Sequence, residues 1–387
     1  MKKVWTNRSI NSDVSVARTL DASWYLDPQV FELEQERIFA RTWQCVARVD
    51  ELAKPGDYLA SDVVGEPIVI LRDGTNKLRA YYNVCPHRAG IVARGKGNRK
   101  SLQCLYHGWT FDLEGCLLRI PGFDGTQEFD PTQNGLKEVR IDTWGSYIFV
   151  NLDPDAAPLA QWWGDVANAT TGLDWSEWRL VERAEYLIDC NWKVYIDNYA
   201  EGYHVPMAHP ALNREMNLDD YYVDTWRFQS TQRVNVKTGG HVSKRRYPNP
   251  GPNDAIKYHV FFPNFMIDCY PDNISCNIVK PITPERTLLT FEWYFKTDVD
   301  QSVMDSMVKF ADEVQYEDIE ICEYVQRGLK SRSYDAGRYS ARHENGVHHF
   351  HELVVEFMNS DEIRLDTSTT PRENWKDFHS SNAAAGD

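Results

Sequence analysis

Short apolar segments separated by turn residues characterise the chain between about residues 42 and 155. These segments are rich in β-branched and aromatic side chains, and the clearest are 67–71, 78–82 and 146–150. Asp73-Gly74 and Glu114-Gly115 have the composition of hairpin turns. We therefore predict a small all-β domain over residues 42–155, with an exit linker at 153–158 that is rich in Asp and Pro.

The rest of the chain mixes helical patterns with long strands such as 288–295, which predicts a second, α+β domain over residues 156–375. Residues 304–326 have the pattern of one amphipathic helix, whose apolar stripe consists of Met307, Ala311, Val314, Ile321 and Val325. We expect residues 1–41 to pack on this second domain and residues 376–387 to form a mobile tail.

A further helix is predicted to begin at Asn191, whose side chain is a good N-cap, and to run through Glu201. Glu201 and His204 are three residues apart and would share a face of that helix. Pro206 disfavours helical geometry at Val205, which would let the chain bend back beyond His204.

Charge and composition narrow the functional classes. The 387 residues carry a net charge of −15, which argues against binding to nucleic acid or to an anionic membrane surface. No apolar run approaches the roughly 18 residues of a membrane span, and residues 1–9 lack the apolar stretch of a signal peptide. The eight cysteines form no disulfide framework, so we expect a cytoplasmic protein.

Two short Cys–His pairs are the strongest chemical signal. Cys85-x-His87 and Cys104-x-x-His107 are separated by sixteen residues, and each pair would supply one thiolate and one imidazole from a single loop. A structural zinc site takes the same ligand types, but zinc motifs usually pair Cys with Cys and His with His. The mixed pairs favour a Rieske [2Fe–2S] cluster, in which two imidazoles replace two thiolates on one iron.

A second group of candidate ligands consists of His204, His209 and a carboxylate. Two histidines and a carboxylate form the facial triad of non-haem Fe(II) oxygenases, whereas two hydrogen-bonded core histidines are the alternative. Asp318 falls inside the apolar stripe of the helix at 304–326, where a carboxylate needs a metal or an ion pair. We predict that Asp318 is the third ligand, with a buried salt bridge to an arginine as the alternative. Glu317 lies at the edge of the stripe and is not expected to affect the metal.

In this order along the chain, the motifs resemble those of a Rieske non-haem iron oxygenase α subunit, from the aromatic-ring-hydroxylating dioxygenase superfamily. The resemblance implies an N-terminal Rieske β-sandwich domain and a catalytic domain with a helix-grip (START-like) antiparallel sheet. It also implies a [2Fe–2S] cluster, a mononuclear Fe(II), and electrons from NAD(P)H through a separate flavin or iron–sulfur reductase. The family's head-to-tail homotrimer would place Glu201 as a carboxylate bridge between His204 and His107 of the neighbouring subunit.

Two segments, 199–206 and 348–351, look more like the choline, glycine betaine, carnitine and stachydrine oxygenases than like aromatic-ring dioxygenases. The resemblance therefore implies hydroxylation or N-demethylation of a small cationic quaternary ammonium compound. Ring cis-dihydroxylation and a Rieske electron carrier without catalysis are the alternatives. Six aromatic side chains could cage the cation or could be ordinary sheet core: Trp226, Phe261, Phe262, Phe265, Tyr270 and Trp293. The histidines at 348, 349 and 351 are expected to be a packed or surface cluster rather than a further metal site.

Overall fold

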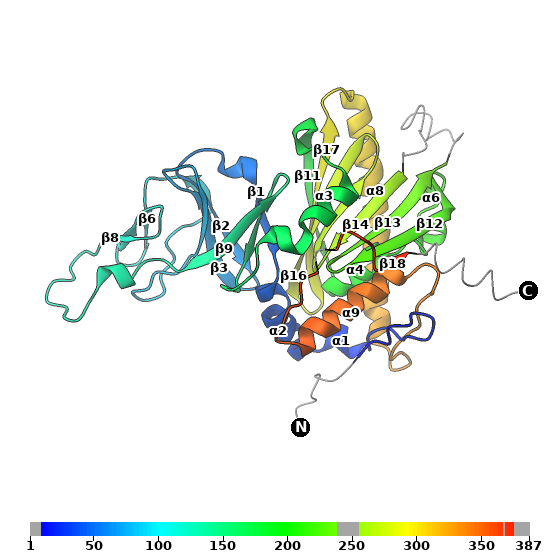
Figure 1. Cartoon of the computed structure of the whole chain (residues 1–387), viewed down its shortest axis with the longest axis horizontal. Coiled ribbons are helices and arrows are strands. Elements are labelled where there is room, and N and C mark those ends of the chain that lie inside the picture. The colour runs from blue at the N-terminus through cyan, green and yellow to red at the C-terminus, as the bar shows by residue number, and fades with distance from the viewer. Residues whose placement is uncertain (1–8, 238–254, 367, 375–387) are drawn as a thin grey trace, which may run out of the picture. The chain divides into compact units, whose positions relative to one another are not determined.

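The computed structural model describes residues 9–237, 255–366 and 368–374, and these fall into two compact units (Figure 1). One unit comprises Phe39–Leu159, and the other joins the residues before it to the residues after it. The tail expected at 376–387 lies outside the described residues. Among the described residues, no helix is both long enough and apolar enough to cross a membrane.

The Phe39–Leu159 unit is a β-sandwich, as predicted. Its described residues form a seven-stranded antiparallel sheet in the order β1-β10-β9-β4-β3-β2-β5 and a three-stranded sheet in the order β6-β7-β8. The elements are η1 (Phe39–Arg41), β1 (Gln44–Arg48), η2 (Val49–Leu52), β2 (Asp57–Val63), β3 (Glu66–Arg72), β4 (Leu78–Tyr82), β5 (Lys96–Asn98), β6 (Leu102–Gln103), β7 (Thr110–Phe111), β8 (Leu117–Arg119), η3 (Pro131–Gln133), β9 (Glu138–Trp144) and β10 (Tyr147–Asn151). The strands predicted at 67–71, 78–82 and 146–150 correspond to β3, β4 and β10.

Strand β3 explains how this unit supports its loops. Successive side chains of a strand point to opposite faces, so Ile68 and Ile70 enter one apolar core while Val69 and Leu71 enter another. The core that contains Val69 and Leu71 also contains both cysteines of the Cys–His pairs. The two loops are therefore anchored on a strand that is buried on both faces.

The second unit is an antiparallel sheet covered by helices. Its described residues form eight strands in the order β11-β17-β16-β15-β14-β13-β12-β18. The elements are α1 (Ser23–Leu26), α2 (Pro28–Arg37), the π-helix η4 (Ala160–Gly164), α3 (Asp165–Thr171), η5 (Trp175–Glu177), β11 (Trp178–Ile188), α4 (Trp192–Tyr199), α5 (Val205–Ala208), α6 (Pro210–Asn213), β12 (Met216–Trp226), β13 (Gln229–Val236), β14 (Ala255–Phe261), β15 (Phe265–Cys269), β16 (Asn273–Thr283), β17 (Arg286–Lys296), α8 (Gln301–Leu329), α9 (Asn345–Asn359) and β18 (Glu373–Asn374). The long helix α8 packs on β11 and α4, and α9 packs on β12, β13 and α2, which is the predicted helix-grip arrangement.

The apolar stripe predicted for α8 is partly wrong. Val325, which was placed in it, is 45% exposed. The buried side chains of α8 include Gln315 and Gln326, which apolar periodicity alone does not select. Both glutamines satisfy polar partners on the elements that α8 covers: Gln315 accepts from the hydroxyl of Tyr195 and Gln326 accepts from the main-chain N–H of Asn191.

A buried ion pair joins the N-terminal helix α2 to α4. Nζ of Lys193 lies 2.6 Å from Oε1 of Glu34, and both side chains are fully buried. Oε2 of Glu34 accepts from the indole N–H of Trp192, and Lys193 also donates to the side chain of Asn191. Helix α2 is thereby fixed to the helix that leads into the second group of candidate ligands.

Candidate metal centres and substrate cavity

Two similar turns present the Cys–His pairs. In the first, Cys85 and Gly90 are joined by a main-chain hydrogen bond of 2.8 Å, and in the second, Cys104 and Trp109 are joined by another of the same length. The N–H of Leu105 donates to the carbonyl of Ile91, which holds the two turns side by side. The sequence thus folds locally into two loops that face each other.

The donor set between the loops fits a two-iron cluster. The thiols of Cys85 and Cys104 are buried and in hydrogen-bonding contact, and burial raises the pKa of Cys85 to about 11. The ring centroids of His87 and His107 are 4.6 Å apart. Nδ1 of each ring is buried without a hydrogen-bond partner, although buried polar atoms are normally paired. Two thiols and two unpartnered imidazole nitrogens are the ligand set of a Rieske cluster.

Gly90 and Trp109 shape this site. A Cβ at position 90 would lie 2.7 Å from Sγ of Cys104, so any larger residue would displace that sulfur. The indole of Trp109 stacks on the ring of His87, with centroids 4.7 Å apart and planes inclined by 4°. These contacts restrict the positions of one thiol and one imidazole.

The chain leading to the second site differs from prediction in detail. Asn191 caps α4 by accepting from the N–H of Lys193, as expected, but the helix ends at Tyr199 and does not reach Glu201. Pro206 does not keep Val205 out of helical geometry, because it stands in the first turn of a new short helix, α5, that begins at Val205. Proline is well tolerated there, since the N–H it lacks would have no partner in the helix. The bend therefore lies between α4 and α5.

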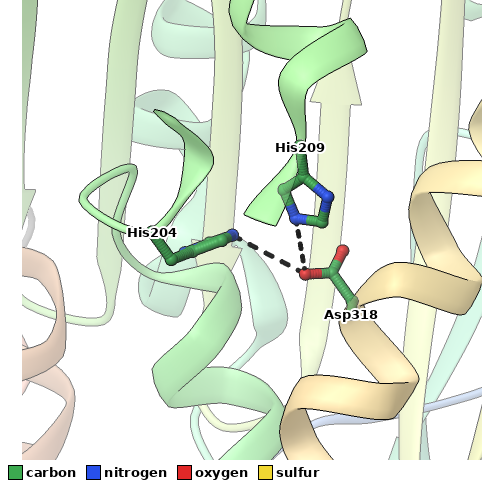
Figure 2. A group of neighbouring side chains, drawn as sticks. All are labelled: His204, His209 and Asp318. Carbon is green, nitrogen blue, oxygen red and sulfur yellow. Dashed lines mark hydrogen bonds and ion pairs between the residues drawn. The ribbon is translucent and has the colours of Figure 1, made fainter. Parts of the chain in front are cut away.

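His204, His209 and Asp318 meet at one point (Figure 2). One ligand atom from each residue lies within 4.8 Å of the other two. Nε2 of His209 is 2.9 Å, and Nε2 of His204 is 3.6 Å, from Oδ1 of Asp318. Within the described residues, the ion-pair partners of Asp318 are these two histidines, not the arginine of the alternative interpretation. The geometry is that of an open three-ligand site.

Two further carboxylates orient the imidazoles. Nδ1 of His204 lies 2.6 Å from Oε1 of Glu201, and Nδ1 of His209 lies 2.6 Å from Oε2 of Glu317. Since an ionised carboxylate can only accept, each Nδ1 carries the proton and each Nε2 is turned toward Asp318. Burial opposes a charge on His209, but hydrogen bonds and charges from Asp318 and Glu317 raise its pKa. A cation bound at Nε2 would displace the proton that a charged ring carries there and would leave the Nδ1 proton in place.

Glu317 is the residue that sequence reasoning missed. It was expected to be unconnected with the metal because it lies at the edge of the helical stripe, yet it contacts His209 directly. Its half-exposed position gave no signal. The adjacent carboxylates Glu317 and Asp318 could have indicated this role. A histidine that binds a metal usually donates its other N–H to a carboxylate, so one of the two could bind the metal and the other a histidine.

We expect Glu317→Ala to weaken the binding of the mononuclear metal by roughly 10-fold, since carboxylates behind metal-bound histidines typically contribute that much. Metal content after dialysis against a graded series of chelator concentrations would measure the change. Glu313→Ala is the matched control on the same helix, because Glu313 makes only a 3.9 Å pair with Lys309. Equal metal retention by the two variants would show that Glu317 does not support His209.

The histidines of α9 are packed, as predicted. His348 and His351 are 1% exposed, and His349 is 8% exposed. Nε2 of His351 lies 2.8 Å from Oδ1 of Asp197, and Nε2 of His348 lies 2.7 Å from the carbonyl of Asn11. None of the three belongs to a group of converging metal-ligating side chains in the part of the chain that the structure describes.

A cavity of about 110 Å³ opens beside His204, His209 and Asp318. It lies between one face of the sheet and the helices α4 and α8. Its walls contain many aromatic rings: Tyr195, Tyr199, Tyr221, Tyr258, Tyr270, Phe291, Trp293, Phe295 and Phe310. Of the six aromatic side chains considered for a cage, Tyr270 and Trp293 line this cavity. The other four are buried in the core: Trp226, Phe261, Phe262 and Phe265.

Comparison with known protein families divides the chain in the same way. Residues 42–130 match the Rieske [2Fe–2S] domain, and residues 175–360 match the catalytic domain of the ring hydroxylating alpha subunit. The chloroplastic choline monooxygenase of Arabidopsis thaliana is 35% identical over 352 residues, covering 87% of this chain and 82% of the relative. The carnitine monooxygenase oxygenase subunit of Acinetobacter baumannii is 32% identical, covering 88% of this chain and 95% of the relative.

Solved structures agree with these relatives. A quaternary ammonium Rieske monooxygenase in complex with L-carnitine is 30% identical, with a TM-score of 0.78, and covers 91% of this chain and 100% of its own. Naphthalene 1,2-dioxygenase from Rhodococcus, at 19% identity and a TM-score of 0.72, covers 88% of this chain and 94% of its own and shares the fold.

Proposed function

This chain belongs to the Rieske-type ring-hydroxylating oxygenase α subunits, and from that premise we propose that it is a terminal oxygenase that hydroxylates a small quaternary ammonium compound. The observation that carries the proposal is the cavity described above, because it joins a three-ligand metal site to a wall of tyrosine and tryptophan rings. Aromatic faces attract quaternary ammonium groups by cation–π interaction. The relatives named for choline and carnitine oxidation support the same substrate class.

The residues fit the two iron cofactors of the family. Cys85, Cys104, His87 and His107 would hold the [2Fe–2S] cluster through two thiolates and two Nδ1 atoms. His204, His209 and Asp318 would hold the mononuclear Fe(II). When bound, these groups supply the electrons and the activation of O2.

The chain's own residues prepare and protect that chemistry. Glu201 and Glu317 hold the two imidazoles with Nε2 directed inward, and the aromatic cavity wall would surround the substrate. Overall, one oxygen atom of O2 enters a C–H bond to give an alcohol. The other atom leaves as water after taking up two electrons and two protons. On an N-methyl group, the resulting hemiaminal releases formaldehyde and the demethylated amine.

We propose that electrons reach the iron from another copy of the chain in a homotrimer. Oε1 of Glu201 already binds His204, which suits Glu201 to link that residue to His107 of a neighbour. Exposed apolar side chains flank both ends of this link: Tyr106 is 58% exposed beside His107, and Tyr203 and Met207 are 58% and 87% exposed beside His204. Exposed apolar clusters commonly mark contact surfaces. A solved quaternary ammonium Rieske monooxygenase has been described with inter-subunit electron transfer.

The electron source in this proposal is NAD(P)H, acting through a separate flavin or iron–sulfur reductase. The proposal also places the protein in the reducing cytoplasm, where the six cysteines outside the cluster would persist as thiols.

Turnover driven by NADH and a reductase tests the function. We expect choline or carnitine, but not naphthalene, to stimulate O2 uptake and to yield a hydroxylated product or formaldehyde. Protein prepared without O2 should hold about three irons per chain, two in the cluster and one in the mononuclear site. Cis-dihydroxylation of naphthalene would favour the aromatic-ring alternative. A content of about two irons, with no turnover of any substrate, would favour an electron carrier.

A further inference from the structure

One row of side chains crosses the sheet and forms the floor of the cavity. The strand register pairs Gln232 with Tyr258, Tyr258 with Asp268, Asp268 with Ser275, and Ser275 with Trp293. Directly paired residues of antiparallel strands point to the same face. All five side chains line the cavity. A carboxylate therefore stands in the middle of the floor.

Asp268 is a buried carboxylate that the metal site does not use. It is 8% exposed, and it accepts hydrogen bonds from the hydroxyls of Tyr199 and Ser275 and from the amide of Asn277. The pKa of Asp268 is raised from its ordinary value, because burial and the charge of Asp318 raise it by more than the three hydrogen bonds lower it. An unpaired buried carboxylate is costly. A cationic ligand in the cavity would offset that cost.

The aromatic side chains beside Asp268 suit a cation without N–H groups. The rings of Tyr199 and Tyr258 meet edge to face, with centroids 6.1 Å apart, and the hydroxyls of Tyr258 and Tyr270 are 2.8 Å apart. A trimethylammonium group donates no hydrogen bond, so it needs ring faces and a nearby negative charge rather than a free acceptor. A carboxylate whose hydrogen bonds are already made by the protein provides such a charge.

Other cavity atoms are unpartnered and neutral. The indole N–H of Trp293, the amide N–H group of Gln315 and the carbonyl Oδ1 of Asn277 are buried without hydrogen-bond partners. Together they offer donors and an acceptor, which match a hydroxyl group. Among the described residues that line the cavity there is no lysine or arginine to neutralise a carboxylate on the substrate.

We propose that Asp268 determines specificity for substrates with a net positive charge, namely quaternary ammonium compounds whose other end is a neutral alcohol, over zwitterions that carry a carboxylate. The inference rests on the proposed function and narrows its substrate class. Asp268 acts through its charge on the bound cation. The carboxylate of a zwitterion would meet that same charge without a compensating lysine or arginine among the described residues that line the cavity.

Binding to the reduced holoenzyme under anaerobic conditions tests the role of charge. Equilibrium dialysis would compare choline with 3,3-dimethylbutan-1-ol, in which a neutral carbon replaces the nitrogen, and with glycine betaine. We expect the native protein to bind choline at least about 10-fold more tightly than either of the others. Asp268→Asn should weaken choline binding on the order of 10- to 100-fold, as expected for losing one charge near the cation. Binding of 3,3-dimethylbutan-1-ol should change little.

Asp224→Asn is the matched control, because Asp224 is a buried carboxylate on the opposite face of the same sheet and pairs with Arg233 at 3.4 Å. It should leave the ratio of choline to 3,3-dimethylbutan-1-ol affinity unchanged. Equal binding of choline and glycine betaine by the native protein would overturn the inference even if Asp268→Asn does not fold. If both compounds bind equally and are both oxidised, the proposed function survives without this specificity. If no quaternary ammonium compound binds or is oxidised, the proposed function and the specificity assigned to Asp268 are both wrong.

Discussion

Replacing Asp318 with alanine will remove the mononuclear iron and abolish turnover, while the visible absorption of the Rieske cluster remains unchanged. Oδ1 of Asp318 is the atom toward which both imidazoles point, and no other carboxylate belongs to this convergent group among the described residues. The Cys–His loops lie in the other compact unit, so their ligands are untouched. Iron analysis together with absorption spectroscopy would separate the two metal sites.

The variants of neighbouring acidic residues make this experiment specific. Asp318→Ala should lose iron fully, because Oδ1 of Asp318 faces Nε2 of both imidazoles. Glu317→Ala should lose it partly, because Glu317 contacts Nδ1 of His209 rather than Nε2, and Glu313→Ala not at all, because Glu313 pairs with Lys309. Retention of one mononuclear iron per chain by Asp318→Ala would exclude it as a ligand. Complete loss in Glu317→Ala with retention in Asp318→Ala would exchange the roles of the two residues.

Glu201→Gln will retain both metal sites but slow electron transfer from the cluster to the iron by roughly 100-fold, at the upper end of effects seen for carboxylates behind metal ligands. Oε1 of Glu201 holds His204, and Oε2 accepts from the main-chain N–H groups of Tyr203 and His204. An amide has only one oxygen, so it can preserve one of these interactions but not both. It also lacks the charge that would attract a neighbour's imidazole N–H.

A single-turnover measurement would detect this defect. When reduced protein is mixed with substrate and O2, the cluster of Glu201→Gln should stay reduced, as judged by its visible absorption. Glu201→Asp tests reach, because it keeps the charge and shortens the side chain by one methylene. Native-rate reoxidation in Glu201→Gln would place the link elsewhere. Asp197, in α4, would then be tested next, although its two oxygens bind Tyr25 and His351.

The sequence predicts best those features that depend on neighbours in the chain. The Cys–His loops are local turns, so the number of residues between each cysteine and its histidine largely determines the geometry of the pair. Asp318 could be selected because a helix has a fixed period, and one carboxylate in a buried stripe stands out. The same reasoning failed for Val325, which is exposed. The buried face of α8 includes Gln326 instead, whose side chain accepts a hydrogen bond from the main chain of Asn191.

Features that depend on strand register were not accessible. In the sequence, Asp268 is a single polar residue within an apolar segment. Its neighbours Tyr258 and Ser275 come from separate strands, so they become known only when the strand register is known. The end of α4 at Tyr199 was likewise not predicted. Glu201 contacts His204 from the bend that follows the helix, and the three-residue spacing of the two positions is also that of neighbours on a helix. The role of Glu317 could not be predicted either, because its contact with the ring of His209 depends on how α8 packs against the segment between α5 and α6.

The buried ion pair between Glu34 and Lys193 has a consequence for how sequences of this kind can diverge. Removing one partner of a fully buried pair leaves an uncompensated charge and costs about 3–5 kcal/mol, whereas replacing both with apolar residues is often neutral. The two positions are 159 residues apart in the chain, yet the stability of each charge depends on the other. We therefore expect a substitution of Lys193 alone to destabilise the protein, and a joint apolar replacement of Lys193 and Glu34 to be tolerated.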